Sequence, residues 1–401
     1  MNATTDTFDA RARDILRNAP LIDGHNDLAY ALREKVGLRT SEVDLHEPQP
    51  DLNTDIPRLR LGAVGGQFWS VWVPAALPEP DAVRQSLEQM DVVHGFIERY
   101  PDTFALTTTA DEAEAAFARG RVASLLGLEG GSMIGSSLSA LRNAYARGVR
   151  YMTLTHWLTT RWADAATDAP RHGGLTAFGR EVVREMNRLG MLVDLSHVSP
   201  DTMATALEVT EAPVIFSHSG ALAVCDHPRN VPDEILQRVR DNGGVVMAVF
   251  LSGFVSQALR DHLRDAPSPD DEEPLARERW LSEHPGPTAT LSQVADHVDH
   301  LRDVAGIDHV GIGSDFDGGD PLPDGLSDVS RFPALLGELL RRGYADDDVR
   351  KVAGGNVLRA LRGAETTATR LKAERAASEA TIEELDGMES TPADDRPVDR
   401  R

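Results

Sequence analysis

Eight short apolar segments, rich in β-branched or bulky side chains, recur along the sequence, and each is short enough to be a buried strand. They cover residues 21–29, 63–73, 122–130, 151–156, 192–197, 213–219, 245–250 and 309–316. Between them, apolar residues lie three and four positions apart, which predicts amphipathic helices over 82–99, 177–189, 201–209, 233–240 and 292–304. Two further helices are predicted over 332–342 and 346–361.

The alternation of strands and helices predicts an α/β fold in the form of a closed (β/α)8 barrel, the TIM barrel. A doubly wound open sheet gives a similar pattern over fewer units, so the count of eight segments favours the barrel. A chain of 401 residues is long enough for one large domain or two ordinary ones. We expect a single domain over residues 1–363, with extra helices at its C-terminal end.

Two segments depart from the alternating pattern. Residues 259–290 form a connection that is long for a strand-to-helix loop and includes the acidic stretch PSPDDEEP. Such a length is typical of a lid or a surface excursion. Residues 364–401 are charged and rich in Ala, Glu and Thr, so we expect a disordered C-terminal tail.

Composition excludes some classes of partner. A net charge of −23 and a pI near 4.9 argue against nucleic acid or an anionic membrane, because both bind basic surfaces. Cys225 is the only cysteine, which excludes an internal disulfide, and we expect it to be a small core residue. No apolar run has the form of a secretory signal or the length of a membrane span, so the expected location is the cytoplasm.

Six of the eight predicted strands end in a histidine or a carboxylate. In a barrel of this type the carboxyl ends of the strands meet at one mouth, so these side chains are expected to gather in a single pocket. Burying such a cluster is costly unless a cation holds it together. The residues concerned are His25 and Asp27, Glu129, His156, His197, His218 and Asp315.

The donor types in this cluster indicate a transition metal. Imidazole nitrogen and carboxylate oxygen without thiolate suit zinc, or less selectively manganese, iron or cobalt, better than calcium or magnesium. His25 and Asp27 are separated by one residue, which on an extended strand turns both side chains to the same face. Taken singly, each residue is more often a turn cap or a core histidine, so the prediction depends on their joint position at strand ends.

Two other motifs are set aside. The stretch from Asp315 through Asp317 to Asp320 resembles a calcium loop, but it lacks the spacing and the final glutamate of an EF-hand. Ser217 and Ser219 flank His218, yet no G-x-S-x-G elbow accompanies them, so we interpret both serines as structural.

Several longer stretches make the chain resemble the membrane dipeptidase family, also called renal dipeptidases. They include LIDGHNDLA, VGGQFWSVWVP, GLEGG, RYMTLTH, PVIFSHS, RNVPDEIL and VGIGSDFDG, and they extend from about residue 21 to about residue 361. The resemblance implies an amidohydrolase-type barrel with two zinc ions bridged by one carboxylate. By this resemblance His25 and Asp27 hold the first ion, His197 and His218 hold the second, and Glu129 bridges them.

The resemblance also implies roles for three further residues. His156 matches the histidine that contacts the substrate and stabilises the tetrahedral intermediate, and Asp315 matches the aspartate that handles the proton. Arg229 matches the arginine that binds the C-terminal carboxylate of the substrate; without the resemblance it reads as a surface arginine near Asp233. Where the family often has a tyrosine after the seventh strand, this chain has Leu251 and Phe254.

The function implied is a zinc-dependent dipeptidase that hydrolyses small dipeptides, L-Xaa-D-Xaa included, by a metal-bridged hydroxide. A homodimer is possible, and the signal peptide and lipid anchor of animal members are not expected here. Two alternatives stay open. One is another amidohydrolase activity, such as a lactonase, a deaminase or a cyclic-amide hydrolase. The other is a metal-binding or scavenging protein without turnover.

Overall fold

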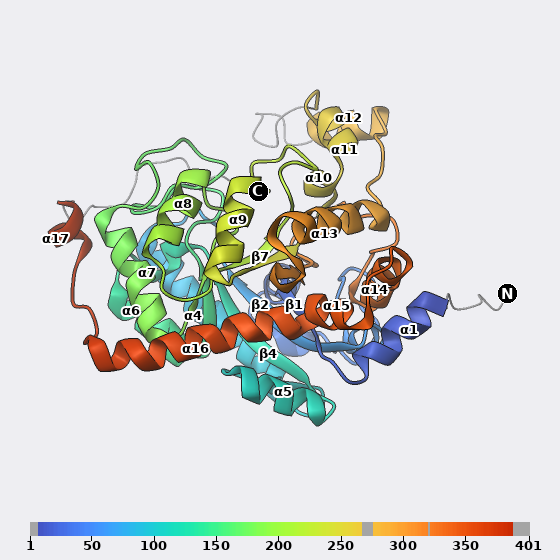
Figure 1. Cartoon of the computed structure of the whole chain (residues 1–401), viewed down its shortest axis with the longest axis horizontal. Coiled ribbons are helices and arrows are strands. Elements are labelled where there is room, and N and C mark those ends of the chain that lie inside the picture. The colour runs from blue at the N-terminus through green and yellow to red at the C-terminus, as the bar shows by residue number, and fades with distance from the viewer. Residues whose placement is uncertain (1–6, 267–275, 320, 388–401) are drawn as a thin grey trace.

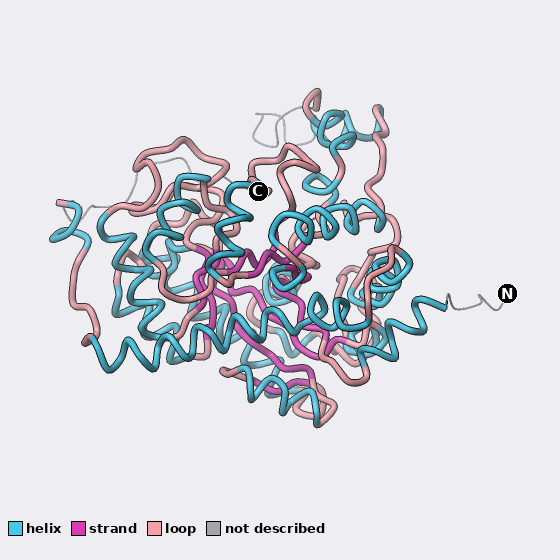
Figure 2. Tube along the Cα trace, viewed as in Figure 1, coloured by secondary structure: helices cyan, strands magenta, loops and turns pink. Residues whose placement is uncertain are grey.

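The computed structural model describes residues 7–266, 276–319 and 321–387. Figure 2 shows the strands gathered in the middle of the molecule, with helices around them. Eight of the strands correspond to the eight segments predicted from the sequence. They are β1 (Leu21–Asn26), β2 (Val64–Trp72), β4 (Val122–Glu129), β5 (Val149–Thr153), β6 (Leu192–Asp194), β7 (Ile215–Ser219), β8 (Val245–Ala248) and β9 (Val310–Ile312).

These eight strands are all parallel and close into a barrel. Their order is β2-β1-β9-β8-β7-β6-β5-β4, and the pairing of β2 with β4 completes the ring. That last pairing is regular from Gly66 opposite Ala123 to Trp72 opposite Glu129. The predicted (β/α)8 TIM barrel is therefore confirmed, and the carboxyl ends of its strands face one mouth.

Helices follow the strands around the barrel, as the apolar spacing predicts. Several begin at a side-chain cap: Thr176 and Ser199 accept backbone N–H groups, and Thr290 forms a capping box with Gln293. The helices that surround the barrel are α1 (Thr7–Leu16), α2 (Leu28–Val36), α3 (Ile56–Leu61), α4 (Glu79–Arg99), α5 (Ala110–Ala118), α6 (Leu138–Ala146), α7 (Ala177–Leu189), α8 (Pro200–Val209), α9 (Asp233–Asn242), α13 (Leu291–Ala305) and α14 (Phe332–Arg341).

A ninth strand was not predicted. The strand β3 (Phe104–Leu106) pairs in parallel with the first half of β4, on the edge that β5 occupies further along. It has three residues, of which only Phe104 is buried. A segment this short carries no periodic signal, which is why the sequence pattern did not indicate it.

The long connection between β8 and α13 forms a helical excursion. It contains α10 (Ser252–Val255), α11 (Gln257–Leu263) and α12 (Ala276–Glu283), and α11 and α12 lie at the edge of the molecule, at the top of Figure 1. The acidic stretch at 267–275 lies outside the described residues. The surface excursion is therefore seen, whereas a lid stays a prediction.

Part of the tail that we expected to be disordered from residue 364 is helical where the structure describes it. Helix α16 (Asn356–Glu374) continues from α15 (Asp346–Arg350) through a π-helical turn, crosses the barrel and packs against α7, and α17 (Ile382–Asp386) follows. Ala364, Ala368 and Leu371 are at most 4% exposed. Their spacing continues the buried stripe of α16 beyond residue 363, in a stretch where the alanine-rich composition conceals it. Residues 388–401 lie outside the described part.

Two further observations concern the single cysteine and the apolar length of the helices. Cys225 is fully buried, as predicted for a core residue. Among the described residues, no helix combines the length and the apolar character needed to cross a bilayer.

Candidate metal centre

The side chains expected at the mouth of the barrel lie together there. His25 and His218 belong to β1 and β7, Glu129 is the last residue of β4, and the others follow directly after a strand or lie just beyond its end. All are at most 8% exposed, although all are polar. The set consists of His25, Asp27, Glu129, His156, His197, His218 and Asp315.

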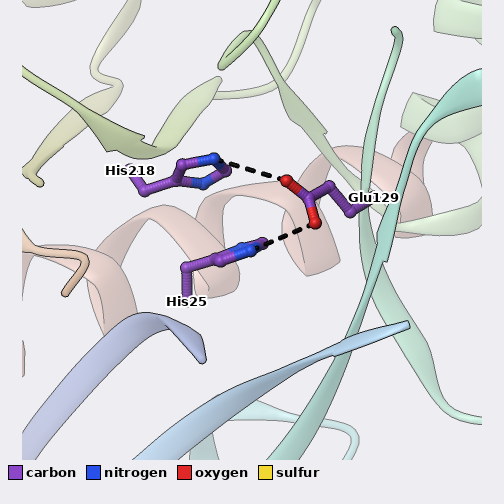
Figure 3. A group of neighbouring side chains, drawn as sticks. All are labelled: His25, Glu129 and His218. Atoms are coloured by element: carbon purple, nitrogen blue, oxygen red, sulfur yellow. Dashed lines mark ion pairs between the residues drawn. The ribbon is translucent and has the colours of Figure 1, made fainter. Parts of the chain in front are cut away.

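The carboxylate of Glu129 lies at the middle of the cluster, with histidines on both of its oxygens. Oε2 is 3.2 Å from His25 Nε2, whereas Oε1 is 3.0 Å from His197 Nε2 and 3.4 Å from His218 Nε2. Figure 3 shows His25 and His218 reaching different oxygens of this carboxylate. The two oxygens therefore face two separate sets of donors.

The spacing of the donor atoms fits metal ligands. Two nitrogens bound at about 2.0–2.1 Å to a tetrahedral zinc ion lie roughly 3.3 Å from each other. Here His197 Nε2 lies 3.0 Å from His218 Nε2, and His25 Nε2 lies 3.2 Å from Asp27 Oδ2. His25 Nε2 is buried and makes no hydrogen bond of regular geometry among the described residues, although Asp27 Oδ2 and Glu129 Oε2 each lie 3.2 Å from it. Such an atom is costly to bury unless a cation meets it.

Asp315 faces the same centre from the end of β9. Its Oδ1 is 4.0 Å from His25 Nε2. Gly318 makes room for it: a Cβ there would lie 2.3 Å from Asp315 Oδ1 and 2.4 Å from Asp27 Oδ2. The loop after β9 therefore closes over both carboxylates only because residue 318 has no side chain.

The backbone is strained at two positions of the cluster. His197 and Asp315 have φ values of 67° and 65°, in the left-handed region that non-glycine residues seldom adopt. Such conformations cost of order 1–3 kcal/mol and are typical of functional sites, where the surrounding structure enforces them. Both side chains are turned into the centre at this cost.

Burial and neighbouring charges shift the protonation of the cluster. Burial, with a contribution from Arg229, lowers the pKa of His197 well below its usual value, and burial with the charge of His25 does the same for His218. The neutral imidazole that results is the form that binds a metal. Burial raises the pKa of Asp315 to about 8, and the carboxylates of Asp27 and Glu129 add to this effect.

Arg229 is not a surface residue. Its side chain is 1% exposed, and Nη2 donates to the backbone oxygen of His218 at 3.2 Å. The guanidinium lies over the rings of Phe254 and Trp157, 5.1 Å and 5.7 Å from their centroids. Its Nε has no acceptor among the described residues, so a donor is available beside the cluster. Phe254, noted as a departure from the family pattern, thus supports this arginine.

His156 borders a cavity beside the cluster. Its ring packs against Trp72 and His197, with centroids 5.2 Å and 4.2 Å apart. The cavity has a volume of about 910 Å³ and lies between the loops that follow β2, β4 and β5. A cavity of this volume is large enough to hold a small-molecule ligand beside the cluster.

Three polar residues that the sequence did not place at the centre contact it; of these, Ser217 was interpreted only as structural. Ser70 donates to Glu129 Oε2 at 3.0 Å, and hydroxyl groups of Tyr151 and Ser217 contact His25 and His218. Ser70 is the one polar residue in the apolar run FWSVW of β2, and this isolated polar position in a buried strand could have indicated a role at the centre. Asp317 accepts from the backbone N–H of Asn53, in keeping with a structural role, and residue 320 lies outside the described part.

Solved structures share this barrel. The probable dipeptidase PvdM from Pseudomonas aeruginosa is 24% identical, covers 90% of this chain and 99% of its own, and has a TM-score of 0.78. The metallopeptidase dipeptidase AC, of family M19, is 27% identical over 86% of this chain and 99% of its own, with a TM-score of 0.74. A metallopeptidase from Rhodobacter sphaeroides, liganded with a phosphinate mimic of the dipeptide L-Ala-D-Ala, is 26% identical with the same coverage and a TM-score of 0.71.

A family model agrees with these structures. The model of membrane dipeptidases, peptidase family M19, matches residues 9–375, which include the whole barrel and every residue of the cluster. The clustered histidines and carboxylates supply the metal-binding groups that a metallopeptidase needs. The chain therefore belongs to the membrane dipeptidase family, peptidase family M19, and is a metal-dependent hydrolase of peptide bonds.

Proposed function

We propose that this protein is a zinc dipeptidase that hydrolyses small dipeptides, L-Xaa-D-Xaa included, with two ions at the metal centre. The observation that carries the proposal is the position of Glu129, whose two oxygens face different histidines. A carboxylate placed between two sets of donors is suited to bridge two ions. The bound dipeptide mimic of the Rhodobacter relative supports the substrate class.

The ligands divide into two sets around this bridge. His25 and Asp27 hold the first ion, since their donor atoms lie 3.2 Å apart beside Glu129 Oε2. His197 and His218 hold the second, since their Nε2 atoms lie 3.0 Å apart beside Oε1. Nitrogen and oxygen donors without thiolate favour zinc.

The catalytic roles follow from position. Bound divalent ions supply a Lewis acid and lower the pKa of water, so that no serine or cysteine nucleophile is needed. Asp315, buried beside His25, takes the proton of the attacking water and passes it to the leaving amine. His156, whose Nε2 lies 3.6 Å from Glu129 Oε1, stabilises the negative charge that develops on the carbonyl oxygen.

Arg229 binds the free carboxylate of the substrate. A buried guanidinium with an unpaired Nε, beside the cluster, is suited to bind a carboxylate with two hydrogen bonds. A carboxylate held here limits the substrate to one residue beyond the scissile bond. The cavity beside His156 then receives the amino-terminal residue, and its 910 Å³ leave room for large side chains.

A substrate panel tests the proposal. The purified protein is assayed on L-Ala-L-Ala, L-Ala-D-Ala, the tripeptide L-Ala-D-Ala-D-Ala, an amidated dipeptide and a simple lactone. We expect hydrolysis of the two free dipeptides and little of the others. Turnover of the lactone without the dipeptides would indicate another amidohydrolase activity. Tight metal binding without any turnover would indicate a scavenging protein. A homodimer, a cytoplasmic location and the absence of a nucleic-acid partner stay predictions from the sequence.

A further inference from the structure

Two of the proposed metal ligands contact a buried hydroxyl group through the ring nitrogen that faces away from the centre. Tyr151 Oη lies 2.8 Å from His25 Nδ1, and Ser217 Oγ lies 2.8 Å from His218 Nδ1. Both hydroxyl-bearing residues are fully buried. A neutral imidazole that binds a metal through Nε2 carries its proton on Nδ1, so the group that faces Nδ1 decides whether this tautomer is favoured.

The hydrogen bonds of Tyr151 favour the metal-binding tautomer of His25. A phenol has one proton, and Oη also lies 3.3 Å from the backbone oxygen of Gly24, which can only accept. When Tyr151 donates to Gly24, its oxygen is left to accept the Nδ1 proton of His25. A short relay therefore runs from His25 through Tyr151 to the backbone of β1.

Neighbouring strands fix the ring of Tyr151. A Cβ on Gly127 would lie 2.0 Å from Cζ of this ring and 2.4 Å from its Oη, so the ring fills space that only a glycine leaves free. Phe68 of β2 packs against it with ring centroids 5.1 Å apart. The hydroxyl of Tyr151 thus has a fixed position relative to His25.

A second relay reaches His218 through Ser217. Ser217 Oγ donates to Asp194 Oδ2 at 2.6 Å. Asp194 also accepts from the hydroxyl of Thr153 and from the backbone N–H groups of Ser196 and Ser217. Because every partner donates to this carboxylate, the proton of Ser217 points to Asp194 and its oxygen faces the Nδ1 proton of His218.

His197 differs from these two histidines. Its Nδ1 is buried without a hydrogen-bond partner in the described part of the chain. Its ring is held instead by packing against His156 and Trp157, at centroid distances of 4.2 Å and 5.3 Å. In the two-ion arrangement each ion therefore has one histidine that a hydroxyl orients, and the two hydroxyls belong to separate networks.

We propose that Tyr151 and Ser217 are positioning residues of the metal centre, which hold His25 and His218 in the tautomer whose Nε2 lone pair faces the metal. Tyr151 acts on the first ion and Ser217 on the second. The inference rests on the two-ion arrangement of the proposed function. Removing such a partner weakens metal binding by about 10- to 100-fold in comparable sites, while the ligands themselves remain.

The test is a chelator titration of zinc-loaded protein, with bound zinc measured by elemental analysis. Tyr151→Phe and Ser217→Ala each remove one oxygen. Their matched controls are Tyr100→Phe, whose hydroxyl bonds Leu45 and Asp44 and no residue of the centre, and Ser124→Ala, a buried serine near the start of β4. Circular dichroism confirms that each variant is folded before the titration.

We expect each test variant to release one ion at a chelator concentration about 10- to 100-fold below that of wild type, and to regain activity in excess zinc. The double variant releases both ions early, whereas the controls match wild type. A wild-type titration curve for Tyr151→Phe or Ser217→Ala, or an equal shift in the controls, would overturn the proposal. The titration gives its answer even if the protein hydrolyses no dipeptide, so failure of the proposed function is seen separately.

Discussion

Gly318 lies against the carboxylate of Asp27, so that a Cβ at residue 318 would be 2.4 Å from Asp27 Oδ2. The same Cβ would meet Asp315, and both contacts are to the ends of side chains, which can turn away. We therefore expect Gly318→Ala to fold with little loss of stability but to lose at least tenfold in kcat/KM, because Asp27 and Asp315 leave their positions.

A matched control exists for this change. Gly253 in α10 has open space where a Cβ would lie, so Gly253→Ala should keep wild-type activity. Thermal unfolding and dipeptide kinetics are measured for both variants. Equal activity of Gly318→Ala and wild type would mean that the two carboxylates need not be held as the structure has them.

Replacing Asp315 by Asn separates proton transfer from metal binding. Asn keeps the size of the side chain but cannot take a proton, and general acid–base groups contribute about 10²- to 10⁴-fold to rate. We expect kcat to fall within this range while the zinc content stays at two ions per chain. Unchanged turnover would remove Asp315 from the chemistry, and loss of an ion would make it a ligand.

Arg229→Ala tests recognition of the substrate carboxylate. A charge-assisted hydrogen bond is worth about 1.5–3 kcal/mol, so kcat/KM for a free dipeptide should fall by one to two decades. The amidated dipeptide, which we expect to be a poor substrate of wild type, should lose much less. Arg229→Lys keeps the charge without the planar pair of donors and should restore only part of the loss. Equal losses on free and amidated substrates would contradict this role.

His297 gives the fold a dependence on pH. It is 1% exposed, its Nδ1 accepts the backbone N–H of Ala221, and burial lowers its pKa to about 4. On its helix, Asp296 opposes and His300 reinforces this shift. Because the folded pKa lies below the unfolded value near 6.5, the neutral form contributes stability above pH 6.5. This contribution, about 3 kcal/mol, is lost as the pH falls toward 4.

The measurement for His297 is the free energy of unfolding by urea at several values between pH 4 and pH 7. His297→Gln should show a flatter dependence on pH than wild type over this range. His94→Gln, which changes a histidine near the surface, should follow the wild-type curve. If His297→Gln also follows it, protonation of His297 does not limit the acid stability.

The barrel was predictable because a parallel strand that is buried on both faces has a continuous run of apolar residues in its sequence. Polar residues at the ends of such runs stand out, and this made His25, Glu129 and Asp315 visible as a group. By contrast, β3 is too short for a periodic signal, and beyond residue 363 the buried side of α16 includes the alanines Ala364 and Ala368, in a stretch rich in alanine and charge. The first residues of the segment that we expected to be a solvated tail therefore belong to a packed helix.

The groups that orient the ligands could not be predicted from the sequence. Tyr151 begins an apolar run and looks like core, and only the pairing of β4 with β5 brings its ring over Gly127. The left-handed backbone conformation of His197 could not be predicted either, because a histidine in a sequence does not indicate this conformation. Such features depend on contacts between strands that are distant along the chain.

The most direct test of the account is the rate of L-Ala-D-Ala hydrolysis as zinc is returned to metal-free protein in known equivalents. If Glu129 bridges two ions, the rate should be negligible without metal, rise with added zinc and reach its plateau at two equivalents per chain. Full hydrolysis by the metal-free protein, or a plateau at one equivalent, would contradict the two-ion centre.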